Sequence, residues 1–272
     1  MSRNGDRNLV APLGTILGVW AHPDDESYLS GAVMAVASDI GNRVVCLTAT
    51  RGERGTGDPS SWPPARLAPL RDAELAAALA ALGVAEHRGL DYPDGACGEV
   101  TAQEAVARIA STMAEVAPDT VLTFGPDGLT GHPDHRAVSA WTTAAFRRVA
   151  RPGARLLYAT TTPEWCDAFA EPNASLGVFQ PGLPSPTPRD ELALELKAAD
   201  AVLERKLAAL RAHSSQVEAL LTALGEDTFR AWVADEVFRA APVNPGAAFE
   251  SQHETQAHLE SAMQSRGSTG RP

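Results

Sequence analysis

The chain has 272 residues, of which 44% are hydrophobic and 21% charged, and its formal net charge is −11. This composition suits one large globular domain or two small ones, and the negative charge argues against nucleic acid or an anionic membrane surface as a partner. No apolar run approaches the roughly 20 residues that span a bilayer, and the N-terminus lacks the apolar region of a signal peptide, so we expect a cytoplasmic protein. The three cysteines form no CxxC pair, which disfavours both a disulfide framework and a thiolate zinc site.

Strands and helices are expected to alternate through the first 160 residues. Short apolar, partly β-branched runs predict strands at 15–20, 43–50, 119–124 and 155–162, with a short further strand at 86–90. Helix patterns and their start and stop residues predict helices at 28–40, 66–82, 101–116 and 134–149. This alternation predicts an α/β fold of the Rossmann-like type, in which a doubly wound, mostly parallel sheet carries helices on both faces.

The ends of the chain and its last third are expected to be less regular. We predict a flexible N-terminus over 1–14, a proline-rich connecting loop over 171–190 and one long helix over 191–212. From residue 244 onward the sequence is small and polar, which is typical of a disordered tail. The prediction is therefore a single α/β domain over 15–243.

A His-Pro-Asp triplet occurs twice, each time shortly after a predicted strand. The stretch "AHPDDES" begins at Ala21, and "TGHPDHR" begins at Thr130. One such triplet could simply begin a helix, because Pro suits the first helical position and Asp suits the cap and first turn. Two copies at the carboxyl ends of strands, where ligands bind in this class of sheet, favour a functional site.

The residue types at the two triplets indicate a divalent metal site. Imidazole and carboxylate ligands suit Zn²⁺ or Fe²⁺, and a catalytic zinc site has three protein ligands and an open position. His22 and Asp25 are three residues apart and can face one crevice, where His135 can supply a third ligand. Asp24 and His132 then remain for proton transfer and for binding a developing oxyanion. The spacing alone does not decide which aspartate binds the metal.

The pair of stretches "AHPDDES" and "GHPDHR" resembles the PIG-L/LmbE-like deacetylases. These are metal-dependent enzymes that remove the N-acetyl group from N-acetylglucosamine-containing compounds. The resemblance runs from about Ile16 to about Gln216, which is most of the predicted domain.

The resemblance implies a role for each polar residue of the two stretches. It makes His22, Asp25 and His135 the metal ligands. It makes Asp24 the general base, and it makes His132 the group that stabilises the oxyanion and protonates the leaving amine. His132 is therefore expected to carry a proton during the reaction, whereas the two histidine ligands are expected to be neutral.

Three neighbouring residues have less certain assignments from the sequence. Asp134 could support the proton on His132, and its role as a helix cap or as a partner of a metal ligand stays open. Glu26 is expected to be structural. Thr130 stands where some relatives carry a tyrosine, so that position cannot supply a phenol to the oxyanion.

Weaker matches suggest residues that bind the sugar. Arg71 in "RDAEL" is a candidate substrate residue, and the alternative is a helix-surface ion pair with Glu74. Asp94 in "YPDG" is a second candidate, and the alternative is an ordinary Pro-Asp-Gly turn. His213 and Gln216 either line the site or only end a helix.

The predicted function is a metal-dependent hydrolase that removes the N-acetyl group from an N-acetylglucosamine-containing small molecule, with water as nucleophile and Asp24 as general base. One alternative is an amidase that cleaves a larger sugar–thiol conjugate. Another is a metal- or sugar-binding module without turnover, against which Asp24 and His132 argue because metal binding does not need them. The expected cofactor is Zn²⁺, and Fe²⁺ suits the same ligands. The expected partner is a small amino sugar, with neither nucleic acid nor membrane, and the sequence leaves a homo-oligomer open.

Overall fold

A seven-stranded sheet forms the centre of the computed structural model, which describes residues 3–242. The strands are β1 (Ile16–Trp20), β2 (Val44–Thr50), β3 (Glu86–Tyr92), β4 (Thr120–Phe124), β5 (Arg155–Thr160), β6 (Leu192–Lys197) and β7 (Asp235–Ala240). Their order in the sheet is β3-β2-β1-β4-β5-β7-β6. All neighbours from β3 to β5 are parallel, whereas β7 is antiparallel to both β5 and β6. The predicted doubly wound, mostly parallel sheet is confirmed.

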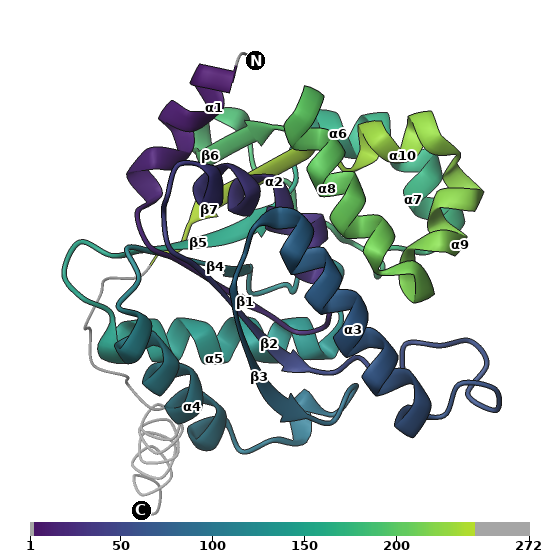
Figure 1. Ribbon diagram of the computed structural model, residues 1–272, viewed down its shortest axis with the longest axis horizontal. Coiled ribbons are helices and arrows are strands. Elements are labelled where there is room, and N and C mark those ends of the chain that lie inside the picture. The colour runs from purple at the N-terminus through teal and green to yellow at the C-terminus, as the bar shows by residue number, and fades with distance from the viewer. Residues whose placement is uncertain (1–2, 243–272) are drawn as a thin grey trace, which may run out of the picture.

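Helices cover both faces of this sheet. They are α1 (Arg3–Val10), α2 (Asp25–Asp39), α3 (Pro64–Leu82), α4 (Ala102–Val116), α5 (Pro133–Val149), α6 (Pro163–Ala168), α7 (Ala170–Leu176), α8 (Asp200–Ala212), α9 (Ser214–Leu224) and α10 (Glu226–Trp232). Helices α4 and α5 pack together as one layer, and α2, α3 and α8 form another (Figure 1). Because both faces are covered, every residue of β1, β2 and β4 is buried. Within 3–242, no helix is both long and apolar enough to cross a bilayer.

The strand order explains why the two His-Pro-Asp triplets meet. The chain passes from β1 outward to β2 and β3, and then returns to the other side of β1 with β4. Neighbouring crossovers therefore leave the sheet in opposite directions between β1 and β4, which is the switch point where ligands bind in such sheets. The first triplet follows β1, and the second lies between β4 and α5.

The segment at 191–212 differs from its prediction. Its Ala/Leu/Glu composition predicts one helix, but residues 192–197 form β6, and α8 begins only at Asp200. Leu194 and Leu196 are buried while their neighbours are more exposed, which is the two-residue period of a strand. Pairing with β7, a strand that the sequence did not predict, outweighs the helix propensity. The predicted loop over 171–190 is likewise helical at its start, where it contains most of α7.

The N-terminal segment also differs from its prediction. Residues 3–13 form α1 and a short 3-10 helix instead of a flexible segment. Val10 and Leu13 are buried in the main core, and Arg155 donates a hydrogen bond to the Pro12 carbonyl at 2.6 Å. Too few apolar residues mark this helix for the sequence to predict it. The predicted disordered tail over 244–272 lies outside the described residues.

Candidate active site

The two turns that carry the His-Pro-Asp triplets are held by the chain around them. Asp25 is the first residue of α2, and its Oδ2 accepts the backbone N–H groups of Ala21 at 3.2 Å and His22 at 2.8 Å. Pro133 is the first residue of α5, and the Nδ1 atom of the capping His132 accepts the backbone N–H of the second helical residue at 3.2 Å. The helix-start interpretation of the triplet therefore holds for the second copy, and it places the imidazoles in position for a site.

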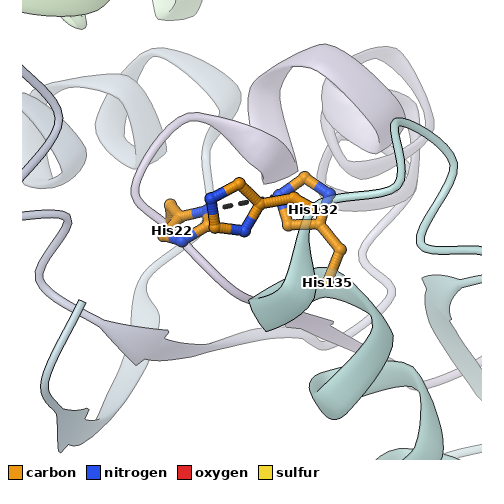
Figure 2. Close-up of side chains that lie close together, drawn as sticks. All are labelled: His22, His132 and His135. Carbon is orange, nitrogen blue, oxygen red and sulfur yellow. Dashed lines mark hydrogen bonds between the residues drawn. The ribbon is translucent and has the colours of Figure 1, made fainter. Parts of the chain in front are cut away.

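The structure brings the three predicted ligands close together, with Asp25 Oδ1 near His135 and Asp25 Oδ2 near His22. His22 Nδ1 lies 3.2 Å from His135 Nε2 (Figure 2). The Asp25 carboxylate lies 3.4 Å from His135 Nε2 and 3.6 Å from His22 Nδ1. Zinc bonds of about 2.0–2.2 Å at tetrahedral angles would place their donors about 3.3–3.6 Å apart. The spacing of the two histidine nitrogens is close to this range, and the Asp25 carboxylate lies beside both of them.

The other ring nitrogen of His135 is occupied by the backbone. Its Nδ1 lies 3.0 Å from the Gly128 carbonyl oxygen, to which it donates, so Nε2 keeps its lone pair. The ring stacks on Phe124 with centroids 4.1 Å apart. Burial lowers the pKa of His135 to about 4. The predicted neutral imidazole is what this environment favours.

His22 has carboxylates on its other side. Its Nε2 lies 3.2 Å from Asp134 Oδ2 and 3.2 Å from Asp94 Oδ1, which leaves Nδ1 to face His135. Although burial opposes protonation, the hydrogen bonds to Asp134, Asp25 and Asp94 hold the pKa of His22 well above its ordinary value. A cation at Nδ1 must therefore displace a proton, so its affinity must depend on pH.

Asp134 supports His22 and not His132. It is fully buried, and its carboxylate accepts the backbone N–H groups of Gly95 at 2.7 Å and Cys97 at 3.0 Å in addition to His22. The sequence leaves Asp134 as either a helix cap or a partner of a metal ligand. Its carboxylate is the partner of His22, a ligand candidate.

The expected proton on His132 disagrees with its surroundings. Its Nδ1 accepts the Asp134 N–H, so a neutral ring carries its proton on Nε2. Burial and the neighbouring His22 lower the pKa of His132. The ring therefore suits a neutral Nε2–H donor. One of its nitrogens lies within 4.8 Å of those of His22 and His135, so His132 is a further ligand candidate beside Asp25. Figure 2 shows the three rings side by side.

Asp24 precedes α2 in a strained conformation beside the ligand candidates. Its φ of 123° is unusual for a residue with a side chain and costs about 1–3 kcal/mol. Its backbone N–H is held by Glu26 Oε2 at 3.0 Å. Burial raises the pKa of Asp24 to about 6, against the charge of Arg71, whose Nη2 lies 3.0 Å from Asp24 Oδ2. A carboxylate with this pKa suits proton transfer near neutral pH.

Arg71 is buried and not part of a surface ion pair. It donates to the carbonyls of Gly52, at 2.8 Å, and Pro23 as well as to Asp24. Glu74 instead accepts hydrogen bonds from Ser214 and Ser215 at the start of α9. The alternative of an Arg71–Glu74 pair is therefore wrong.

Three of the four weaker sequence matches, Arg71, Asp94 and Gln216, line the same cavity as the ligand candidates, and His213 does not. Asp94 lines the cavity and accepts the backbone N–H of Arg54 at 2.8 Å. Burial raises the pKa of Asp94, but the hydrogen bond with His22 outweighs this effect and holds the pKa at about 2. His213 is fully buried and donates to Glu26 at 2.8 Å, so it joins α8 to the start of α2, and Glu26 is structural as predicted.

A cavity of about 580 Å³ contains this cluster. Asp24, Arg71 and the three histidines form part of its lining, and Thr130 lies there with its hydroxyl 3.4 Å from His135 Nδ1. Large apolar side chains from α6, α7, α9 and α10 line another part. The sequence did not predict these, because nothing in their spacing distinguishes cavity lining from core.

Comparison with known proteins finds a match over the part of the chain that carries both His-Pro-Asp triplets. Residues 17–146 match the family described as "PIG-L: GlcNAc-PI de-N-acetylase". The 1D-myo-inositol 2-acetamido-2-deoxy-alpha-D-glucopyranoside deacetylase of Kineococcus radiotolerans is 36% identical over 249 residues, covering 74% of this chain and 68% of the relative. The enzyme of the same name from Streptomyces griseus is 30% identical and covers 96% of this chain and 94% of its own.

Solved structures share the fold. The N,N'-diacetylchitobiose deacetylase from Pyrococcus horikoshii superposes with a TM-score of 0.58 at 24% identity and covers 86% of both chains. At this identity the likeness shows the fold alone. The two deacetylases from Kineococcus radiotolerans and Streptomyces griseus match this chain over two thirds or more of both chains. The matched family region includes both His-Pro-Asp triplets, and the chain therefore belongs to the PIG-L family of de-N-acetylases.

Proposed function

We propose that this protein is a metal-dependent N-deacetylase that hydrolyses the acetamido group of an N-acetylglucosamine-containing small molecule. The observation that carries the proposal is Asp24, a carboxylate with a pKa of about 6, beside two histidine nitrogens 3.2 Å apart and the Asp25 carboxylate, which lies within 3.6 Å of both. Metal binding alone does not require such a base. The names of the relatives, which are sugar deacetylases, support the choice of bond and of sugar.

His22, Asp25 and His135 are the proposed ligands of the cation, for which Zn²⁺ and Fe²⁺ are both suitable. When bound, the cation supplies a Lewis acid that lowers the pKa of water and polarises a carbonyl oxygen. Asp134 and the Gly128 carbonyl hold the two histidines in the tautomers that metal binding needs.

Asp24 and His132 carry the proton chemistry of the proposal. Asp24 takes a proton from the attacking water, whose oxygen forms a bond to the acetamide carbon. Neutral His132 donates Nε2–H to the oxygen on which negative charge develops. The C–N bond then breaks, and the proton held by Asp24 passes to the leaving nitrogen. The products are acetate and the free amine.

The test is acetate release from N-acetylglucosaminides by metal-loaded protein, with chelator-treated protein as the control. We expect release only with the metal. For a conjugate that carries a second amide, free amine without acetate would instead identify an amidase that cleaves that amide. No hydrolysis of any acetamide would contradict the proposal.

The role of Asp24 is tested by Asp24→Asn, which keeps the size of the side chain and suits the positive φ. We expect kcat to fall by about 10²–10⁴-fold because the base is lost, with metal content unchanged. Asp25→Asn is expected to lose the metal. The matched control is Asp227→Asn at an exposed position on α10, which should change neither. Loss of metal in Asp24→Asn would contradict the assignment.

A further inference from the structure

Aromatic side chains form one continuous part of the cavity lining. Tyr28, Trp165, Phe179 and Trp232, named here the aromatic wall, all line the cavity. Trp232 lies 5.8 Å from Tyr28 and 6.1 Å from Trp165, between ring centroids, and Trp165 lies 6.2 Å from Phe179. Leu220 of α9 lines the same cavity. Figure 1 shows α6, α7, α9 and α10 gathered on one side of the molecule, beyond α8.

The two indoles of the aromatic wall offer no free polar group to a ligand. The indole N–H of Trp165 donates to the Trp232 carbonyl, and that of Trp232 donates to Asn173, each at 3.0 Å. Both indoles are therefore fixed in place, with their donors already used. The Tyr28 hydroxyl is buried and has no partner among residues 3–242.

We propose that the substrate carries an apolar aglycone, aryl or alkyl, which packs against the aromatic wall while the acetamido sugar lies at Asp24 and His22. This inference rests on the proposed function and specifies its substrate class. Apolar surface that leaves water here gains free energy in proportion to its area. A polyol such as inositol would instead lose water at its hydroxyls without gaining partners from the two indoles. The cavity of about 580 Å³ has room for more than a sugar ring, because pockets of about 300–1,000 Å³ hold drug-sized ligands.

The test compares four N-acetylglucosaminides that share the sugar and differ in aglycone: methyl, inositol, phenyl and octyl. We expect kcat/KM for acetate release to be at least about tenfold higher for phenyl or octyl than for methyl, because apolar contacts of this size give such factors. The inositol glycoside should be no better than the methyl glycoside. A phenyl preference would identify an aryl aglycone, and an octyl preference an alkyl one. A higher kcat/KM for the inositol glycoside would overturn the proposal.

Two variants locate the effect. In Leu220→Gln, a partly exposed position at the cavity, the ratio of kcat/KM between the preferred apolar glycoside and the methyl glycoside should fall by about tenfold. The matched control is Val149→Gln, where an apolar side chain is 36% exposed on α5 outside the cavity lining, and it should keep the wild-type ratio. Equal effects of the two substitutions would contradict the assignment of the aglycone to this cavity.

Binding separates this inference from the proposed function. Trp165 and Trp232 report on the aromatic wall through their fluorescence, so the four glycosides are also titrated into chelator-treated protein, in which no turnover is expected. Tighter binding of the phenyl or octyl glycoside supports the apolar site even if no acetate is released. Acetate release together with equal binding of all four would overturn the inference and leave the deacetylase standing.

Discussion

Two buried groups of charged side chains lie along α2 and differ in how completely they are satisfied. Behind the helix, Lys206 and Glu236 are fully buried and 2.7 Å apart. Lys206 also donates to the Tyr28 carbonyl, and the Glu236 carboxylate accepts the N–H groups of Ala32 and Val33. At the start of the helix, the donors of the site instead face one another across a cavity. In the first group the charged atoms are all paired with one another or with the backbone. In the second group two ring nitrogens face each other, which leaves room for a cation.

The difference is most evident at the two histidines that are candidate ligands. His22 Nδ1 and His135 Nε2 are 3.2 Å apart, and the other nitrogen of each ring is held by Asp134 or by the Gly128 carbonyl. Two lone pairs at this distance repel unless a proton or a cation lies between them. A structural pair such as Lys206–Glu236 needs no added proton or cation, because a donor already faces an acceptor. Acceptor atoms that face one another without a donor therefore indicate a ligand site. The number of buried charges does not, because a structural ion pair has them as well.

Lys206→Met should have the largest effect, because it leaves the Glu236 carboxylate buried without its cation. Breaking a buried pair in this way costs about 3–5 kcal/mol. We expect this loss in the free energy of unfolding, measured with denaturant, and we expect the folded fraction to keep its metal affinity. Lys197→Met on β6 is the matched control, since Lys197 is 71% exposed, and it should change stability by less than about 0.5 kcal/mol. Similar losses in both variants would show that the pair is not special.

Asp134→Asn tests the other side of the comparison. The amide keeps the shape of the carboxylate but cannot hold the Nε2 proton of His22 while accepting both backbone N–H groups as well. We expect metal affinity to weaken by about 10–100-fold, measured by competition with a chelator of known affinity. Asp167→Asn, at an exposed position on α6, is the control. An affinity in Asp134→Asn within about twofold of the wild type would mean that Asp134 does not position the ligand.

The sequence predicted the ligand candidates better than their supports. His22, Asp25 and His135 lie in two short stretches directly after predicted strands, and the strand order brings these stretches together. The sequence indicates Asp134 as part of the site but does not show that it pairs with His22. Its position depends on contacts with Gly95 and Cys97, in a loop whose path the sequence does not specify.

The sequence does not predict the Lys206–Glu236 pair, because only the fold brings these two residues together. They lie on α8 and on β7, a strand that the sequence did not predict. The prediction of one helix over 191–212 is wrong over its first residues for the same reason. Local composition favours a helix there, but pairing with β7 makes residues 192–197 a strand. Local patterns therefore predicted the chemistry of the site, whereas contacts between distant segments determined its support.

Arg71→Gln should have the smallest effect and acts through Asp24. Burial raises the pKa of Asp24 to about 6 and the charge of Arg71 opposes this rise, so removal of the charge should raise the pKa further. Because a base must be deprotonated to act, kcat/KM should fall as pH drops through the pKa of Asp24, and a bound cation moves this fall to lower pH. In Arg71→Gln the fall should shift to higher pH by about one unit or more. Arg51→Gln, which removes an exposed arginine paired with Asp72, should keep the wild-type profile. A lower plateau without a shift along the pH axis would mean that Arg71 contacts the substrate and does not set the charge state of Asp24.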